Sequence, residues 1–176
     1  LFERLYWLGK RARGLTGLPR LDNMLSVYFG TKHLRDKVRH CLDVDPRKVF
    51  YVRMSRGCLG SCSYCAIKLA TGNLKSKAPE EVLREVKDGL SQGYALIRML
   101  AEDFGCYGVD IGTDIARLLN DVFSLGKGKD FRLIVRNFNA QWLIRYYDQL
   151  EKVICAHHAK FMYMHIPVQS GSDKIL

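Results

Sequence analysis

Three cysteines, Cys58, Cys62 and Cys65, follow one another with the spacing C-x3-C-x2-C, directly after an apolar run at residues 49–54. Cysteine thiolates are the usual ligands of iron–sulfur clusters, and a cluster with four irons normally takes four of them. Three neighbouring thiolates would leave one iron free to bind another molecule. The spacing therefore favours a cluster with an open coordination site.

Two other uses of the same cysteines are less well supported. A structural zinc site would need a fourth Cys or His at regular spacing, and no second C-x2-C pair follows. A disulfide within so short a loop would be strained, and no feature of the sequence marks the chain as secreted. Buried or adventitious cysteines remain the plain alternative to a cluster.

The cysteine spacing, with an aromatic residue before the last cysteine, resembles the signature of radical S-adenosylmethionine (SAM) enzymes. In that superfamily the cysteines hold a [4Fe-4S] cluster whose open iron chelates the amino and carboxylate groups of SAM. Further segments, in the same order, resemble the radical SAM methylthiotransferases from about residue 49 to the last residue. These segments are residues 56–58, 65–68, 72–76 with 79–81, 102–103, 107–113 and 165–173.

The resemblance implies a reaction, cofactors and partners. Reductive cleavage of SAM would give methionine and a 5′-deoxyadenosyl radical, and the cluster would need an electron donor. A second SAM would supply the methyl group, and a second [4Fe-4S] cluster, in a domain absent from this chain, would take part in sulfur delivery. The segment at residues 107–113 most resembles the branch that inserts a methylthio group into N6-threonylcarbamoyladenosine near the tRNA anticodon.

Some positions depart from that branch. Phe104 and Cys106 stand where it usually has Thr and Ala, and residues 136–139 lack the usual Asn-Pro. We expect these positions at the rim where the substrate is selected. A divergent radical SAM enzyme acting on another RNA base or a peptide, a non-catalytic cluster- or zinc-binding RNA module, and a core fragment inactive without its flanks remain alternatives.

The composition is compatible with an RNA-binding globular protein. With 28 Lys and Arg against 18 Asp and Glu, the chain has a formal net charge of +10, which favours a polyanionic partner such as tRNA, although solvated surface lysines would give the same excess. No apolar run is long enough to span a bilayer, so we expect no membrane partner. Free thiols and clusters need a reducing compartment, which predicts a cytoplasmic location.

We interpret the chain as an excerpt of a longer protein, with two parts. Residues 1–48 are expected to be a linker or helical remnant leading from a missing N-terminal domain, because only Cys41 precedes the cysteine loop. A basic arm that touches RNA is the alternative for this region. Residues 49–176 are expected to form a partial radical SAM core.

Strand and helix patterns alternate from residue 49 onward. Apolar runs predict strands at residues 49–54, 95–101, 131–135 and 161–166. Helices are predicted from Pro79 to a stop at Gly93, over 114–125 with Thr113 as N-cap, and from an N-cap at Asn139 to about residue 154, with Leu143, Tyr146, Tyr147 and Leu150 facing inward. This alternation predicts an α/β fold, and the resemblance makes it a partial (β/α) barrel truncated after about four parallel strands.

The carboxyl ends of parallel strands meet at one edge of a sheet, where active sites form. The cysteine loop, Glu102 and the segment at residues 169–172 all follow predicted strands, so we expect one shared site. By resemblance, Tyr64 lies near the adenine of SAM, with a core position as its alternative.

The remaining polar residues have weaker signals. A carboxylate such as Glu102 could accept hydrogen bonds from the ammonium of SAM, or form a structural salt bridge. Gln169, Ser170 and Ser172 could bond its ribose or carboxylate, although Ser-Gly-Ser also suits a turn. We expect His165 to be a satisfied core residue, and Cys106 and Cys155 to be inert buried thiols.

Overall fold

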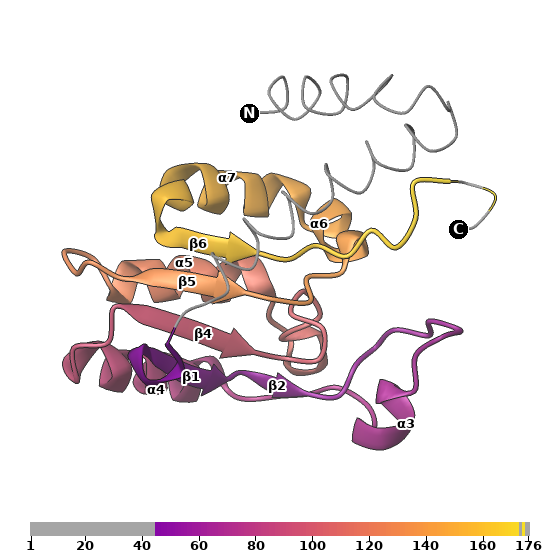
Figure 1. Ribbon diagram of the computed structural model, residues 1–176, viewed down its shortest axis with the longest axis horizontal. Helices are drawn as coiled ribbons and strands as arrows, with labels where there is room; N and C mark the ends of the chain where they lie inside the picture. The colour runs from indigo at the N-terminus through magenta and orange to yellow at the C-terminus, as the bar shows by residue number, and fades with distance from the viewer. Residues whose placement is uncertain (1–44, 173, 175–176) are drawn as a thin grey trace, which may run out of the picture. The chain divides into compact units, whose positions relative to one another are not determined.

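The computed structural model describes residues 45–172 and residue 174 of the 176-residue chain (Figure 1). Most of the expected linker at residues 1–48 therefore lies outside the described residues, and the domain boundary after residue 48 stays a prediction. The described part begins with the short 3-10 helix η1 (Pro46–Lys48), and the first strand follows it directly.

A four-stranded parallel sheet forms the centre of the described residues. Its spatial order is β1-β4-β5-β6, and all three neighbouring pairs are parallel. Because each crossover between neighbouring strands contains a helix, the predicted α/β fold with parallel strands is confirmed. In chain order the elements are β1 (Val49–Arg53), α4 (Pro79–Ser91), β4 (Leu96–Leu100), α5 (Ile115–Leu125), β5 (Arg132–Val135), α6 (Ala140–Arg145), α7 (Tyr147–His157), η3 (His158–Lys160) and β6 (Phe161–Met164).

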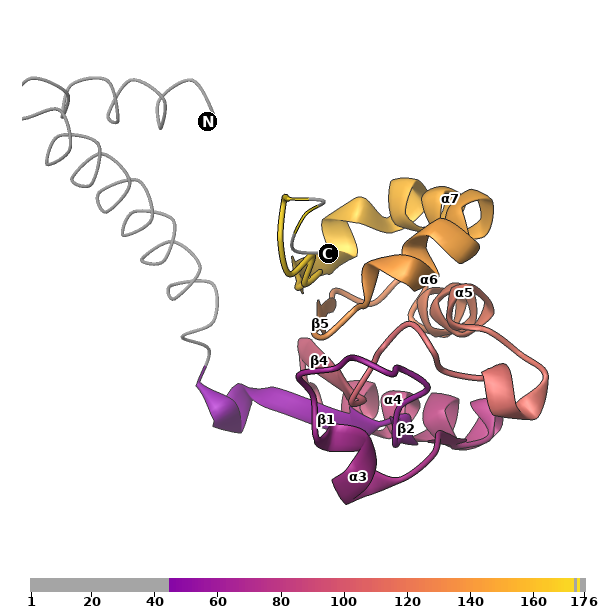
Figure 2. The same cartoon turned by 90° about the vertical axis from the view of Figure 1, so that its right-hand side faces the viewer.

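Helices α4, α5 and α7 lie on the same side of this sheet (Figure 2). The strand residues that alternate toward the helices are almost fully buried, and they pack with apolar stripes of α4 and α5 into one core. This core includes Val52, Ile97, Met99, Leu133 and Val135 from the strands, and Val82, Val86, Ile115, Leu118, Leu119 and Val122 from the helices. Among the described residues, no helix is both long and apolar enough to span a membrane.

Gly89 lies inside α4, where glycine costs about 1 kcal/mol relative to alanine. A Cβ at this position would lie 2.6 Å from the ring of Phe50 in β1. The glycine therefore lets α4 approach the sheet closely, and the contact also shows that Phe50 points to the helix-covered side.

Two details of the predicted helices are wrong. Asp114, not Thr113, is the N-cap of α5, and its Oδ1 accepts a hydrogen bond from the Arg117 N–H at 2.9 Å. The helix expected from Asn139 to about residue 154 is split at Tyr146 into α6 and α7, although Asn139 does cap it. Tyr147, the first residue of α7, is 59% exposed and does not face inward.

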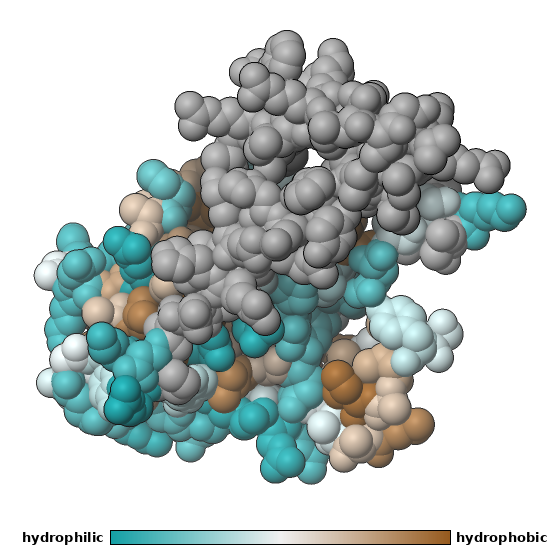
Figure 3. Space-filling model, viewed as in Figure 1, coloured by the Kyte–Doolittle hydropathy of each residue, from teal (hydrophilic) through white to brown (hydrophobic). Residues whose placement is uncertain are grey.

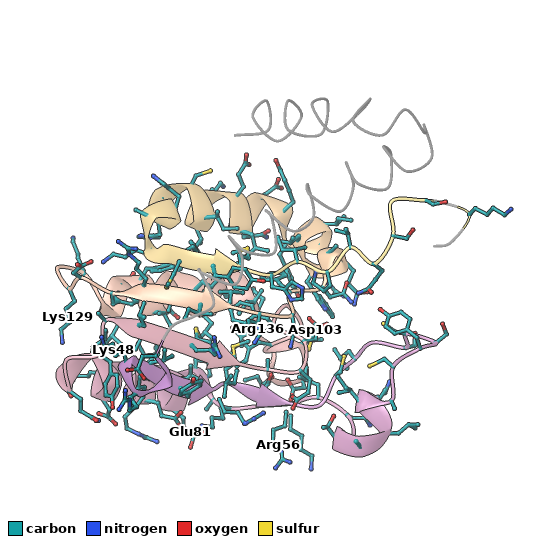
Figure 4. The ribbon with its side chains drawn as sticks, in the orientation of Figure 1. Lys48, Arg56, Glu81, Asp103, Lys129 and Arg136 are labelled. Carbon is teal, nitrogen blue, oxygen red and sulfur yellow. The ribbon has the colours of Figure 1, made fainter. Side chains whose placement is uncertain are left out.

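Different residues lie at the amino and carboxyl ends of the parallel strands. Asp103 and Arg136 follow β4 and β5 at the carboxyl ends of the strands, whereas Lys48 and Lys129 precede β1 and β5 at the amino ends (Figure 4). The residues with predicted chemistry therefore lie toward the carboxyl edge, as expected for this class of fold.

Candidate active site

The cysteine loop leaves the carboxyl end of β1 through a short hairpin. β2 (Ser55–Arg56) pairs antiparallel with β3 (Lys75–Ser76), and the segment between them carries the three cysteines and the short helix α3 (Ile67–Thr71). Gly57 opens the loop with φ of 80°, and a Cβ there would lie 2.1 Å from the backbone oxygen of Asn73. Only glycine fits this close approach, so the hairpin and Gly57 together fix where the loop begins.

The three thiols lie on the exposed side of this loop. Cys58 is partly buried, and Cys62 and Cys65 are exposed. The N–H of Gly60 donates to Cys58 Sγ at 3.2 Å, and a Cβ on Gly60 would lie 3.2 Å from Cys58 Sγ and 3.7 Å from Cys62 Sγ. The two sulfurs therefore flank the same point of the backbone.

The surroundings of Cys58 disfavour a free thiolate. Burial raises the pKa of the Cys58 thiol, and the Gly60 N–H partly opposes this rise. The negative charge of Asp103 raises the pKa further. A thiolate at this position therefore needs a positive charge beside it, which a bound metal supplies.

A cavity of about 490 Å³ lies against the cysteine loop. Its lining combines the loop and α3 with segments that follow β4, β5 and β6. The chemistry-bearing residues among them are Cys58, Cys62, Tyr64, Cys65, Lys68, Glu102, Asp103, Asn137, Asn139, His165 and Gln169. The structure thus brings all three cysteines, Tyr64, Glu102 and Gln169 to one cavity.

The outer wall of the cavity is apolar and exposed. Helix α3 has no buried residue, and Leu69 on it is 90% exposed. In Figure 3 the hydrophobic colour gathers at α3, next to the cysteine loop. The predicted alternative that Tyr64 is a core aromatic is wrong, because this side chain is 68% exposed. The neighbouring Cys62 raises the pKa of its hydroxyl.

Glu102 has one carboxylate oxygen in use and one without a partner. Oε1 accepts a hydrogen bond from Arg53 Nη1 at 3.3 Å. Oε2 is buried and has no hydrogen-bond partner among the described residues. A buried carboxylate oxygen without a donor is costly, so this atom favours a ligand that brings an N–H or a positive charge.

Asp103 joins the segments that follow β4 and β5. Its carboxylate accepts hydrogen bonds from Trp142 Nε1 at 2.7 Å, from the Gly105 N–H at 3.1 Å and from the Asn139 N–H at 3.4 Å. Burial raises the pKa of Asp103, and these three hydrogen bonds oppose the rise. The residue is 4% exposed, so its main role is to hold together the segments that follow β4 and β5.

The predicted core role of His165 is wrong. Its backbone extends the sheet, since its N–H donates to the Val135 carbonyl and its carbonyl accepts from the Phe138 N–H, both at 3.0 Å. Its side chain lines the cavity, and Nδ1 is buried without a hydrogen-bond partner among the described residues. Two other lining residues, Asn137 and Gln169, adopt left-handed backbone conformations with φ of 59° and 63°. Such strained positions concentrate at functional sites.

A family model described as the radical SAM superfamily matches residues 52–176, well over half of the chain. The match includes every residue that lines the cavity. The chain belongs to the radical SAM superfamily.

The chain is also similar to curated proteins with more specific names. It is 39% identical, over 89% of its length, to a probable threonylcarbamoyladenosine tRNA methylthiotransferase of Pyrococcus horikoshii, and covers 36% of that protein. The Pyrococcus abyssi protein of the same name is 40% identical over 96% of the chain, with 42% of that protein covered. The Mus musculus threonylcarbamoyladenosine tRNA methylthiotransferase is 34% identical over 71% of the chain, with 21% covered. The chain therefore spans about two fifths or less of these relatives.

A solved structure has the same fold. It is a radical SAM methyltransferase, TsrM, from Kitasatospora setae, with a tryptophan substrate and a SAM analogue bound. The TM-score is 0.55 at 14% identity, over 73% of this chain and 23% of that protein. At this identity the likeness concerns the fold alone, and it supports the radical SAM type of α/β architecture.

The residues present fit the [4Fe-4S] cluster and SAM of the radical SAM superfamily. Three thiols in one loop face a cavity that also holds an unpartnered carboxylate oxygen, Glu102 Oε2. Among residues 45–172 and 174, no group of three or more His, Cys, Asp or Glu side chains converges on one metal ion. Each thiolate of a cubane binds a different iron, so convergence on one point is not required.

Other predicted residues have mixed outcomes. Ser170 and Ser172 are not among the residues that line the cavity, and the Ser172 N–H donates to Ser170 Oγ at 3.1 Å, which is turn chemistry. Their predicted contacts with SAM are not tested by this. Cys106 is fully buried, as predicted, but Cys155 is exposed, so its predicted burial is wrong.

The two departures at Phe104 and Cys106 do not lie at the substrate rim. Both side chains are fully buried, and the Phe104 ring packs against Phe138 with centroids 5.4 Å apart. The expectation that they alter the surface for substrate selection is wrong, because they fill the core beneath that surface. Asn137 and Asn139 in the RNFN segment do line the cavity.

Proposed function

We propose that this chain is the catalytic core of a radical SAM methylthiotransferase, which inserts a methylthio group into N6-threonylcarbamoyladenosine of tRNA. The observation that carries the proposal is the cavity itself, because three thiols on one loop and an unpartnered buried carboxylate oxygen line the same space. This is the combination needed to hold a cluster and a cationic amino acid side by side.

Cys58, Cys62 and Cys65 would hold the [4Fe-4S] cluster, and the cavity beside them would hold SAM. When bound and reduced, the two together supply a 5′-deoxyadenosyl radical. The chain itself positions the reactants and keeps water away from them. The hydrogen bond between Asp103 and Trp142 holds the segments after β4 and β5, which form part of the cavity wall, in place.

The residues around the thiols would position SAM. Glu102 Oε2 would accept a hydrogen bond from its ammonium group, while Arg53 holds the other oxygen. Tyr64, exposed beside the loop, would contact the adenine ring. Gln169 lines the cavity and would bond the ribose or the carboxylate, with Ser170 and Ser172 following it in the same turn.

Three observations support a tRNA substrate. The relatives named above carry it in their names, and they match most of this chain. A net charge of +10 favours a polyanion. The departures at Phe104 and Cys106 are buried, so they give no reason to expect a different substrate.

The proposed reaction needs parts beyond this chain. An electron donor must reduce the cluster, and a second [4Fe-4S] cluster, held by a further domain, would take part in sulfur delivery. We therefore assign the complete reaction to the full-length protein.

The test is an activity assay of the anaerobically reconstituted full-length protein. It is incubated with SAM, a reductant and tRNA that carries N6-threonylcarbamoyladenosine, and the nucleosides are analysed by mass spectrometry. We expect the methylthio derivative from the wild type and none from Cys62→Ser. Intact cluster and SAM binding without this product would overturn the substrate or the reaction, and absence of SAM binding would favour a non-catalytic RNA-binding module.

A further inference from the structure

The side of the sheet away from the helices carries unpartnered polar atoms. Among the described residues, four buried side-chain N or O atoms have no hydrogen-bond partner, and they belong to Ser55, Arg98, Glu102 and His165. Glu102 and His165 line the cavity of the candidate site. Native structures leave few such atoms, and each calls for an explanation such as a bound ligand. The proposed SAM contacts account for Glu102, and among the other three residues Arg98 carries the only permanent charge.

The strand register places Arg98 on the side of the sheet that faces away from α4, α5 and α7. Phe50 contacts Gly89 of α4, so its neighbour Tyr51 points to the opposite side. Arg98 pairs in register with Tyr51, and residues paired in parallel strands share a side. The same register continues to Ile134 in β5 and Tyr163 in β6. We call Tyr51, Arg98, Ile134 and Tyr163 the inner row.

The inner row lies nearer the amino ends of the strands than the cavity does, and in β4 Leu100 lies between Arg98 and the cavity residue Glu102. Arg53 is two residues beyond Tyr51 along β1, about 7 Å farther toward the carboxyl edge, and it bonds to Glu102 of the cavity lining. On the other edge strand, Tyr163 stacks with the cavity residue His165 at a centroid distance of 6.4 Å and an angle of 7°. The row therefore borders the cavity lining at both edge strands, although none of its four residues lines the cavity itself.

Arg98 provides the positive charge of this row. Its guanidinium carbon lies 5.6 Å from the centre of the Tyr51 ring, a cation–π contact. Arg53, by contrast, is paired with Glu102, whereas Arg98 forms no ion pair or hydrogen bond with another side chain among residues 45–172 and 174. A partly buried guanidinium between Tyr51 and Ile134 suits a flat ligand with a carboxylate, because guanidinium and carboxylate match in geometry as well as charge.

We propose that Arg98 binds the threonine carboxylate of the N6-threonylcarbamoyladenosine substrate, with the inner row as the floor of the substrate site. This assignment rests on the proposed function. In the binding mode implied for SAM, the open iron would hold its carboxylate and amino groups, and the N–H of that amino group would face Glu102. The threonyl group then brings the carboxylate that remains to be neutralised. Arg98 thereby distinguishes the threonylcarbamoyl nucleoside from plain adenosine, which lacks this anion.

The test measures the binding of three anticodon stem-loop RNAs to the reconstituted full-length protein by fluorescence anisotropy. One RNA carries N6-threonylcarbamoyladenosine, the second its methyl ester, which masks the carboxylate, and the third adenosine. Backbone contacts are common to all three, so the ratio of dissociation constants isolates the carboxylate. For the wild type we expect the acid to bind at least about tenfold more tightly than the ester.

The variants assign this preference to one residue. Arg98→Met should remove the difference between acid and ester, while Arg98→Lys, which keeps the charge, should retain part of it. Arg132→Met is the matched control, because Arg132 lies on the same side of the sheet but two residues nearer the amino ends of the strands. This variant should keep the wild-type preference for the acid over the ester. The cluster absorbance of each variant shows whether the site has assembled.

The outcomes separate this inference from the proposed function. If the wild type prefers the acid and Arg98→Met keeps that preference, Arg98 does not bind the carboxylate, although the proposed substrate stands. If the wild type binds acid and ester equally yet methylthiolates the modified tRNA, the inference is again wrong. If it neither prefers nor modifies the threonylcarbamoyl RNA, the proposed function fails, and this inference fails with it.

Discussion

The two sides of the four-stranded sheet differ in how their side chains are satisfied. Ile97 and Arg98 are neighbours in β4 and point in opposite directions. Ile97 is fully buried in the core beneath the helices, where its surroundings are apolar throughout. Arg98 faces away from these helices, and its buried Nε has no partner among the described residues.

This difference separates stability from chemistry. The helix-covered side consists of complementary apolar surfaces and needs no ligand. The opposite side and the carboxyl ends of its strands carry buried atoms of Arg98, Glu102 and His165 that have no partner within the described part of the chain. Buried polar groups without hydrogen bonds lower the folding stability. We therefore interpret their presence on one side of the sheet as the result of a site that binds ligands there.

The largest effect should come from the cysteine loop. Cys62 is exposed, so Cys62→Ser should leave the metal-free fold within about 0.5 kcal/mol of the wild type but abolish cluster binding. Iron analysis and visible absorbance after reconstitution measure this loss. Cys155→Ser, another exposed thiol but outside the cavity lining, is the control and should bind iron normally. Full iron loading of Cys62→Ser would show that the loop does not hold the cluster.

A substitution on the helix-covered side should have the reverse effect. Ile97→Ala removes a fully buried side chain from the core, which should cost about 2–5 kcal/mol of unfolding free energy. Denaturant unfolding of the metal-free full-length protein measures this cost. A loss below about 1 kcal/mol would mean that the core is not packed as the contacts indicate.

Asp103 links the segments that follow β4 and β5, and its contribution to stability should depend on pH. Burial raises its pKa in the folded state, so the folded protein takes up this proton before the unfolded chain does as the pH falls. The charged carboxylate thus opposes folding at neutral pH, and this penalty fades as the pH falls through the raised pKa toward the ordinary value. Relative to Asp103→Asn, the wild type should therefore gain stability on acidification. Thermal unfolding of both metal-free proteins from pH 7 downward tests the sign, and a pH-independent difference would contradict it.

The smallest effect on stability should come from Arg98. Arg98→Met removes a buried nitrogen that has no partner among the described residues, so stability should stay within about 0.5 kcal/mol of the wild type or increase slightly. The unfolding free energy is measured by the same denaturant experiment as for Ile97→Ala, so the two variants compare adjacent residues of β4. A loss as large as that of Ile97→Ala would mean that both sides of the sheet serve stability.

Much of the fold was predictable because periodic apolar residues dominate it. All four strands begin and end within two residues of the prediction, since each is an apolar run bounded by polar or glycine residues. The hairpin of β2 and β3 and the helix α3 were not predicted. Each is five residues or shorter and lacks a repeating pattern, so only the tertiary context defines it.

The candidate site was predictable where residue types carry the chemistry. The cysteines, Glu102 and Gln169 were found from spacing and position after strands, and they share the cavity. The structural role of Asp103, which holds two segments together by hydrogen bonds, was not predicted because its partners Trp142 and Asn139 are distant in the sequence. For Arg98 and His165, the alternation along each strand gave the signal, but only the sheet register shows which side is open.

The most direct measurement is electron paramagnetic resonance of the reduced, anaerobically reconstituted full-length protein, with and without SAM. We expect a [4Fe-4S]+ signal that changes when SAM is added, because three thiolates would leave one iron open and the cavity beside them would hold SAM. In Glu102→Gln the signal should persist while a higher SAM concentration is needed to change it. A wild-type spectrum that is identical with and without SAM would contradict a SAM-binding cluster in this cavity.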